Sequence, residues 1–444
     1  MEEEFNIELT EDTILELPTD LFYHKINDSL LVISQAKANW IALFNEEQEK
    51  VFGLLFEKKS LGEILQNSDE IEFNFVISQI IDRDFLATQK VSFNEPHNEG
   101  LYIYLTNDCN LACTHCYMFS GKPNINELPK EEWFKIIKNA KENSIKSITF
   151  TGGEVLQYKD WFEVIQNAKE NNITVTILTN GILWDEDKIK QAKDYIDEIQ
   201  ISLDGTDEKS NAIIRGKGGF HKALENIKLF VKYGVKTVIA TTPTLENIKH
   251  IETTYIDFAQ GLLKEMNSPN LYFKIAQKLL TGRKIDMLTK SRAKEYSDIT
   301  GKLANILYPD EEIRNFINNM QIGTGLRNCG YGGLSISSDG KFFLCNRVED
   351  IEPIATNKDD FKNILEKANY YYNWSSVDNV LPCMNCEIKY ICGGGCRIDE
   401  YHFSGKHKNI KEQQPLIKID CTTEYKNSIY DKMLNSIKYT YQVE

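Results

Sequence analysis

Apolar and polar residues alternate with a period of two in three short stretches near the start of the chain. A period of two is typical of strands that bury one face. Polar or turn-prone residues such as Asn27 and Asp28 separate the stretches. The pattern therefore predicts three strands, over Phe22 to Ile26, Leu30 to Ser34 and Trp40 to Phe44.

The spacing of apolar residues then changes to that of helices. Helices are predicted over Glu46 to Phe56, Leu61 to Leu65 and Ile71 to Phe85, with Asn45 and Ser60 as N-caps of the first two. Three small strands followed by three helices resemble a winged-helix domain, the shape that many peptide-modifying enzymes use to hold the leader of a precursor peptide. Such leaders add a strand to an exposed sheet edge, and here we expect that edge to be Trp40 to Phe44, beside the helix around Phe73 to Ile81. A capping domain and a DNA-binding winged helix are the alternatives, and the acidic stretch Asp69 to Asp84 disfavours DNA.

From about residue 100, strand-like apolar runs alternate with helical patterns at the spacing of βα units. Six strands are predicted, over Leu101 to Leu105, Ser147 to Thr151, Thr174 to Leu178, Glu198 to Leu203, Thr237 to Thr241 and Leu271 to Ile275. This alternation predicts an α/β fold, a partial (β/α)6 TIM-like barrel. In such barrels, chemistry collects at the C-terminal ends of the strands.

The composition narrows the class of protein. The chain has 444 residues, is 41% hydrophobic and carries a net charge of -15, so it can bury several cores and lacks a general nucleic-acid footprint. The acidic start and the lack of an apolar run of membrane length predict a cytoplasmic protein with no membrane partner. In a reducing compartment, its ten cysteines are expected to be metal ligands rather than disulfides.

Three cysteines, Cys109, Cys113 and Cys116, follow the first barrel strand within one short loop. Their spacing lets three thiolates surround an iron-sulfur cluster and offers no fourth cysteine, which leaves one iron open. Two alternatives remain: a zinc knuckle with His115 as a fourth ligand, or three buried structural thiols. The spacing resembles the signature of the radical S-adenosylmethionine (SAM) enzymes, in which SAM chelates the open iron.

Further polar motifs fall at the ends of the next strands. The resemblance implies that Gly152, Gly153 and Glu154 receive the amino group of SAM, with two glycines that allow a close approach of the backbone to a ligand. It implies that Ser202 and Arg215 hold the ribose and carboxylate ends of SAM, and Asn180 and Asp204 belong to the same cofactor-binding set. Each motif is weak alone, but together they lie behind the three-cysteine loop at the ends of successive strands.

Seven more cysteines lie in the C-terminal part of the chain. Cys329 and Cys345 flank Gly340, the run Cys383-x2-Cys386-x5-Cys392-x3-Cys396 follows, and Cys421 comes last. This order resembles the auxiliary-cluster domain called SPASM. The resemblance implies one complete cluster on Cys383, Cys386, Cys392 and Cys421 and a second on Cys329, Cys345 and Cys396. The second lacks a protein ligand, and a substrate thiolate, Asp339, Glu349 or water are the candidates for the vacant place.

The whole assembly resembles the SPASM-containing radical SAM maturases of ribosomally made peptides, of the thioether-forming sactisynthase and ranthipeptide type. The expected domains are a recognition domain over 1–95, a radical SAM barrel over 96–315 and a SPASM domain over 316–444. The resemblance implies SAM and three [4Fe-4S] clusters as cofactors, with a precursor peptide and a flavodoxin- or ferredoxin-like electron donor as partners. Reductive cleavage of SAM would start hydrogen abstraction from the peptide, and a cysteine thioether is the favoured cross-link.

Other outcomes stay open on the sequence. Carbon-carbon or carbon-oxygen cross-linking comes next, followed by oxidation of a protein residue as in anaerobic sulfatase maturases. Those enzymes usually begin with the barrel and carry Asp beside an auxiliary cysteine, whereas this chain has Asn346 after Cys345. An iron-sulfur electron carrier or a peptide-binding chaperone with structural metals would not be an enzyme.

Overall fold

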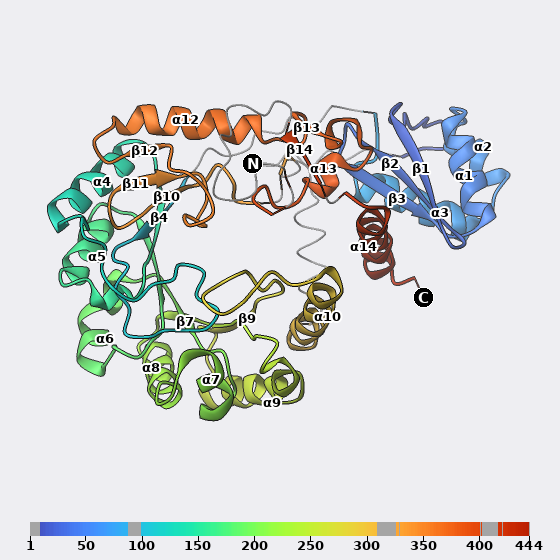
Figure 1. Ribbon diagram of the computed structural model, residues 1–444. Coiled ribbons are helices and arrows are strands. Elements are labelled where there is room, and N and C mark those ends of the chain that lie inside the picture. The colour runs from blue at the N-terminus through green and yellow to red at the C-terminus, as the bar shows by residue number, and fades with distance from the viewer. Residues whose placement is uncertain are drawn as a thin grey trace.

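The computed structural model of the protein describes residues 9–87, 99–308, 326–327, 329–399, 401, 416–419 and 421–443. In Figure 1, a barrel of strands and helices fills the left and lower parts of the view, and a small sheet with three helices lies at the right. Helix α12 (Phe361–Trp374) extends across the top between these two parts.

The N-terminal part is a three-stranded antiparallel sheet covered by three helices, as predicted. The strands are β1 (Leu21–Ile26), β2 (Ser29–Ser34) and β3 (Asn39–Leu43), and the helices are α1 (Glu46–Phe56), α2 (Leu61–Gln66) and α3 (Glu70–Asp82). Asn45 and Ser60 accept hydrogen bonds from the first turns of α1 and α2, which confirms both N-caps. Helix α3 ends three residues before the predicted Phe85.

Strands β2 and β3 of this sheet are buried on both faces. Val32 and Ile41 pack in the core shared with α1, α2 and α3. Leu31, Ile33 and Trp40 pack instead against the C-terminal helices α13 (Lys389–Cys392) and α14 (Thr423–Tyr441). The N-terminal domain is therefore joined to the cysteine-rich part through an apolar interface rather than through a linker alone.

The central part contains the six predicted parallel strands, which confirms the partial α/β barrel. They are β4 (Gly100–Tyr104), β5 (Ser147–Thr151), β6 (Thr174–Thr179), β7 (Glu198–Ser202), β8 (Lys236–Thr241) and β9 (Leu271–Ile275), in that order across the sheet. Helices pack outside them: α4 (Lys130–Glu142), α5 (Trp161–Glu170), α6 (Glu186–Ala192), α7 (Glu208–Arg215), α8 (Phe220–Lys232), α9 (Ile248–Met266) and α10 (Lys290–Leu307). Short 3-10 turns cover Val155–Gln157, Lys193–Tyr195 and Cys383–Asn385.

The C-terminal part extends the barrel sheet, which the sequence pattern did not predict. β10 (Leu334–Ile336) pairs in parallel with β4, and β11 (Lys341–Phe343) and β12 (Ala355–Thr356) continue the sheet to nine strands. A second small sheet joins β13 (Val380–Leu381) and β14 (Leu416–Ile417). Cys329, which precedes β10, and Cys345, which follows β11, are thereby held near the first barrel strand.

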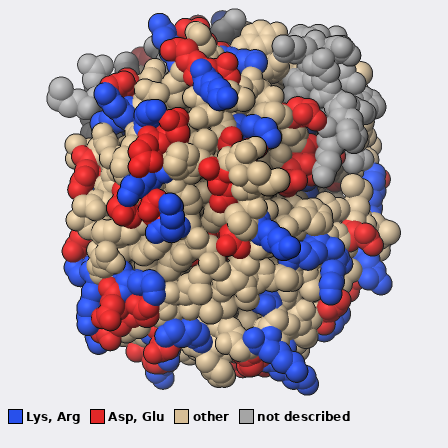
Figure 2. Space-filling model, turned by 60° about the vertical axis from the view of Figure 1, so that its left-hand side comes forward, with Lys and Arg blue, Asp and Glu red and all other residues tan. Residues whose placement is uncertain are grey.

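Charges on the barrel side of the molecule are mixed in sign. Figure 2 shows Lys and Arg interspersed with Asp and Glu over the face toward α4 to α6, without one large patch of either sign. No helix in the described ranges is both long and apolar enough to cross a membrane.

Candidate active site

The three-cysteine loop lies between β4 and α4, at the C-terminal ends of the parallel strands. Cys109, Cys113 and Cys116 all line one cavity of about 500 Å³. Burial raises the pKa of the Cys109 thiol to about 11. Burial also raises the pKa of Cys113, although the nearby Arg215 opposes that shift. Thiols that are costly to ionise, such as those of Cys109 and Cys113, are suited to bind cationic iron, which replaces their protons.

The predicted glycine pair fixes the position of this loop. Gly153 donates its backbone N–H to the Thr106 carbonyl oxygen at 2.7 Å, and Glu154 donates to that of Asp108 at 2.8 Å. A Cβ atom on Gly153 would lie 2.1 Å from the Asp108 oxygen, and one on Gly152, whose φ is +154°, would lie 2.5 Å from the Thr106 oxygen. The close approach that requires glycine is therefore an approach to the cluster loop. Both glycines also line the cavity.

Glu154, which the resemblance assigned to the SAM-binding set, is not among the residues that line the cavity. Its carboxylate is 1% exposed and accepts hydrogen bonds from Thr179 Oγ1 at 2.6 Å and the Asn180 N–H at 2.8 Å. Burial raises the pKa of Glu154, and these two donors oppose the shift. Asn180 does line the cavity and donates its side-chain amide to Asn110 Oδ1 in the cluster loop at 2.8 Å. Glu154 thus holds the strand end that carries Asn180.

Asp204 is also turned away from the cavity. It is 0% exposed, and its Oδ2 atom lies 2.8 Å from His115 Nε2 and 2.6 Å from Arg215 Nε. Burial would raise the pKa of Asp204, but Arg215 and His115 outweigh it and lower that pKa to about 2. Because Asp204 occupies Nε2 of His115, that nitrogen is not directed toward the three cysteines as a fourth ligand.

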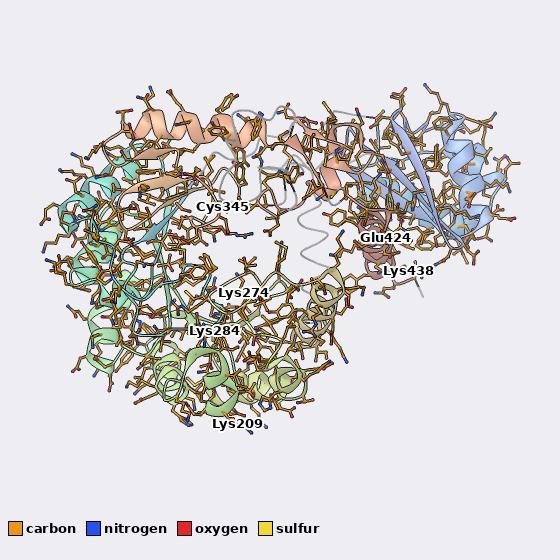
Figure 3. The ribbon with its side chains drawn as sticks, in the orientation of Figure 1. Lys209, Lys274, Lys284, Cys345, Glu424 and Lys438 are labelled. Carbon is orange, nitrogen blue, oxygen red and sulfur yellow. The ribbon has the colours of Figure 1, made fainter. Side chains whose placement is uncertain are left out.

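Five of the seven predicted cofactor-binding residues line the cavity together with the cysteines. They are Gly152, Gly153, Asn180, Ser202 and Arg215. Sequence reasoning missed the other wall, which includes Lys274 on β9 and Asn346. Alternation along β9, in which Leu271, Phe273 and Ile275 are buried and Lys274 is not, is a signal that could have identified Lys274. In Figure 3, Cys345, which precedes Asn346, lies above Lys274.

Two tyrosines connect the cluster loop with the neighbourhood of Cys345. Tyr117, which lines the cavity, has its hydroxyl 3.0 Å from that of Tyr104, and the Tyr104 hydroxyl donates to the Asn346 carbonyl oxygen. Burial raises the pKa of Tyr117 to about 12, so its hydroxyl stays protonated at neutral pH. Two hydrogen bonds therefore link Tyr117 in the three-cysteine cavity to the residue that follows Cys345.

The seven C-terminal cysteines form two groups. Cys383, Cys386, Cys392 and Cys421 line a single cavity of about 310 Å³, together with Lys418 and Lys426. Burial raises the pKa of Cys386 to about 11. These four thiols are the set that the resemblance assigned to one complete cluster.

Cys345 lies close enough to Cys329 and Cys396 for their charges to affect it. Burial raises the pKa of Cys345 to about 11, and the other two thiols add to the shift. Asp339, one candidate for the vacant ligand place, instead bonds Lys341 Nζ at 2.6 Å and Ser337 Oγ at 2.5 Å. Asp339 and Glu349 line a separate cavity of about 400 Å³.

The spacing of the sulfur atoms bears on the zinc alternative. In the part of the chain that the structure describes, no three His, Cys, Asp or Glu side chains are arranged to hold a single metal ion. A zinc ion draws its ligands in to about 2.3 Å from one centre. Seven of the ten cysteines instead line cavities, three in one and four in the other, as ligands of a larger polynuclear cluster do.

The predicted docking edge of the N-terminal sheet is closed, which corrects the expectation for Trp40 to Phe44. Both backbone groups of Ala42 bond the buried side-chain amide of Gln79, at 2.9 Å and 2.8 Å. Arg83 Nε donates to the Trp40 carbonyl oxygen at 2.7 Å, and Gln48 accepts from the Phe44 N–H at 2.7 Å. Side chains of α3 and α1 have thus taken the place of a fourth strand.

The opposite edge, β1, carries two exposed aromatic side chains. Phe22 is 43% and Tyr23 54% exposed. Since Ala42 faces outward on β3, the alternation of the ladder turns the backbone groups of Tyr23 and Lys25 outward on β1. Among the described residues, neither has a loop or side-chain hydrogen bond on that edge. β1 is therefore the open edge of this sheet.

A family model matches the part of the chain that carries the three-cysteine loop. Residues 103–257 match the family model of the radical SAM superfamily, so this part of the chain is a radical SAM domain.

Two proteins that are similar to parts of the chain are maturases by name. The sporulation killing factor maturation protein SkfB of Bacillus subtilis is 29% identical over 150 residues, which cover 34% of this chain and 37% of SkfB. The mycofactocin maturase MftC of Mycolicibacterium smegmatis is 25% identical over 320 residues, 68% of this chain and 78% of MftC. The match to SkfB thus spans little more than a third of that relative's length.

Solved structures share the fold. SuiB of Streptococcus suis bound to S-adenosylmethionine superposes with a TM-score of 0.50 at 19% identity, covering 90% of this chain and 100% of SuiB. The anSMEcpe enzyme with bound AdoMet has a TM-score of 0.56 at 20% identity, covering 77% of this chain and 97% of that chain.

Proposed function

We propose that the protein is a radical SAM maturase that installs a cross-link, most simply a cysteine thioether, in a ribosomally made precursor peptide. One observation carries the proposal: Cys109, Cys113 and Cys116 share a large cavity at the strand ends, while Asp204 holds Nε2 of His115 away from them. Three thiolates without a fourth ligand suit a [4Fe-4S] cluster with one iron left for a cofactor.

The cavity wall fits SAM by its donor chemistry. Ser202 and the Asn180 amide offer neutral hydrogen-bonding groups, and Arg215 offers a guanidinium suited to a carboxylate. No Asp or Glu is among the described residues that line this cavity. When bound, the reduced cluster and SAM supply a 5'-deoxyadenosyl radical that abstracts hydrogen from an unactivated carbon.

The C-terminal cysteines would hold two auxiliary [4Fe-4S] clusters. Cys383, Cys386, Cys392 and Cys421 would complete one cluster, and Cys329, Cys345 and Cys396 would bind the other with one place open to a substrate thiolate. A thioether forms when the peptide loses one hydrogen atom from carbon, one proton from the thiol and one electron. The site near Cys345 lies beside the cavity and can receive that electron.

We further propose that the leader of the precursor docks on β1. The outward backbone of Tyr23 and Lys25 can pair with an added strand, whereas β3 is occupied by Gln79 and Arg83. Replacing Lys25 with Pro removes an outward N–H without removing a bond between β1 and β2. Binding of the leader should be lost in Lys25→Pro and unchanged in Gln79→Ala. A leader that binds more tightly to Gln79→Ala, or normally to Lys25→Pro, would favour β3.

We further propose a cellular compartment and an electron donor for the protein. The ten cysteines suit metal ligands in a reducing compartment, so we assign the protein to the cytoplasm, where a flavodoxin- or ferredoxin-like donor would reduce it.

The basic test uses the protein alone. Protein reconstituted without oxygen, then given SAM and dithionite, should release 5'-deoxyadenosine, and replacement of Cys109, Cys113 and Cys116 by Ala should abolish the release. An iron-sulfur carrier or a chaperone would release none.

If a short reading frame beside the gene encodes a cysteine-containing peptide, that peptide should then lose two hydrogens per link on co-expression, and an unchanged peptide mass argues against cross-linking.

Oxidation of a single protein residue is the second candidate. A cysteine-type anaerobic sulfatase-maturating enzyme of Clostridium novyi is 26% identical over 330 residues, 86% of its length. Protease digestion separates the two functions, since a cross-link keeps two peptide fragments joined and oxidation of one residue does not.

A further inference from the structure

Asp204 lies where three elements of the barrel meet. Its carboxylate contacts His115 from the cluster loop, Arg215 from the end of α7 and the Thr242 N–H, 2.7 Å from Oδ1, at the end of β8. Its own backbone is also held, by the Asn211 and Asn247 side chains at 3.0 Å and 2.7 Å. A carboxylate with no exposure and contacts to two cationic or polar side chains is firmly placed.

The contact with Arg215 determines which edge of the guanidinium faces the cavity. Nε forms the ion pair with Asp204, although its N–H is not aligned for a hydrogen bond. Nη1 lies 3.9 Å from Cys113 Sγ on the other side. The Thr114 N–H donates to the Ile214 carbonyl oxygen at 3.0 Å, so the cluster loop and the end of α7 are also joined through the backbone.

Without Asp204, the guanidinium would have other anions to bind. The Cys113 sulfur already lies 3.9 Å from Nη1, and a cation released from its ion pair would turn toward that thiolate. The imidazole of His115, released at the same time, would be free to turn Nε2 toward the cysteines. Both movements would obstruct the position that the three-cysteine loop leaves open.

We propose that Asp204 is a positioning residue that keeps this position open, by holding the Arg215 guanidinium with its outer edge toward the cofactor carboxylate and the His115 ring away from the cysteines. The proposal rests on the proposed function. It reassigns Asp204 from direct contact with SAM to control of two other side chains.

The direction in which SAM affinity changes in Asp204→Asn separates a positioning role of Asp204 from a simple effect of its charge. Asp204→Asn removes a negative charge next to a site for a carboxylate, so electrostatics alone would make SAM bind more tightly. Positioning makes the opposite prediction, because Asn cannot hold both Arg215 and His115. Losses of 10- to 100-fold are typical when a group that orients a ligand-binding residue is removed.

The experiment measures the dissociation constant of SAM by equilibrium dialysis, and the electron paramagnetic resonance spectrum of the reduced protein with and without SAM. We expect Asp204→Asn to weaken SAM binding about tenfold and to reduce the spectral change caused by SAM. Binding equal to or tighter than that of the wild type overturns the proposal.

A matched control lies three residues away. Asp207 also pairs with a histidine, His250, at 3.1 Å, but these side chains are 49% and 41% exposed and lie outside the cavity. Asp207→Asn should bind SAM like the wild type.

If Asp204→Asn does not fold, a second variant replaces it. Arg215→Lys keeps the positive charge but loses the Nε contact with Asp204, and it should show the same loss of SAM affinity. Wild-type affinity in Arg215→Lys overturns the proposal. Failure of the wild type to bind SAM would instead contradict the proposed function.

Discussion

The cavity of Cys109, Cys113 and Cys116 and the cavity of Cys383, Cys386, Cys392 and Cys421 differ in how complete their ligand sets are. The first places three thiols from one loop in about 500 Å³, and the second places four thiols in about 310 Å³. Four thiols complete the shell of a cubane cluster. Three thiols in a larger cavity leave room for a molecule that binds the metal directly.

Cations line both cavities. Lys418 and Lys426 line the four-cysteine cavity. Arg215, Lys274 and Lys278 line the three-cysteine cavity, and Arg215 is paired there with the buried Asp204. Under the proposed function, the difference between the two sites therefore lies in the number of thiols: four would hold a complete cluster, and three would leave a position for a cofactor.

The largest effects on SAM cleavage and iron content are expected when single cysteines of the two cavities are removed. Cys113→Ala should abolish release of 5'-deoxyadenosine, because the catalytic cluster loses one of three ligands. Cys386→Ala should keep most of the release while losing about four irons per chain, the content of one cubane. Iron analysis and chromatography of the nucleoside measure both. Loss of all release in Cys386→Ala would show that the two sites are not separate.

The next largest effect is expected at the glycine pair. Gly153→Ala would drive a Cβ atom into the Asp108 oxygen, so the cluster loop must move. Displacement of reacting groups by about 1 Å costs about 100-fold in rate, and we expect a loss of that size in SAM cleavage. Gly121→Ala is the control, because a Cβ there meets nothing within 4 Å. Equal activities of the two variants would contradict the role assigned to Gly153.

A stability effect is expected in the cysteine-rich part. Arg397 is 0% exposed and donates to the carbonyl oxygens of Ser375, Gly393 and Gly395. Arg397→Ala leaves these buried acceptors without this donor, so the free energy of unfolding should fall by about 3 kcal/mol. Denaturant unfolding without oxygen measures it. A change below about 1 kcal/mol would mean that water replaces the guanidinium.

The smallest effect is expected at Tyr425. Its hydroxyl lies 3.5 Å from Cys392 Sγ. Tyr425→Phe removes a weak donor to a cluster thiolate, so the reduction potential of that cluster should fall by about 40 mV, equivalent to ~1 kcal/mol for one electron. Potentiometric titration measures the shift, and release of 5'-deoxyadenosine should not change. A shift in the reduction potential of the three-cysteine cluster instead would contradict the assignment of Tyr425 to the cluster that Cys392 binds.

Strands and helices with regular spacing were predictable from the sequence, and the strands of the barrel begin and end within a residue or two of expectation. The strands β10 to β12 were not, since two or three residues are too few to show a period. Their pairing depends on the sheet edge that β4 offers, a tertiary contact.

The same limit applies to the candidate site. Spacing identified the cysteines, because ligand number and chain reach constrain each other. Spacing predicted that Glu154 and Asp204 lie near the cavity, but it could not predict where their side chains point. That direction depends on partners from other segments, which only the fold brings close. The edge at β3 was wrongly expected to be open, because only the packing of α3 brings Gln79 against Ala42.

The central claim is that the three-cysteine site keeps one coordination position free for SAM. The most direct measurement is the electron paramagnetic resonance spectrum of the reduced double variant Cys345→Ala, Cys386→Ala, which isolates the catalytic cluster, before and after SAM is added. The account predicts a spectrum that changes on addition of SAM, followed by release of methionine and 5'-deoxyadenosine. A spectrum that SAM does not alter, or zinc in place of iron, would contradict it.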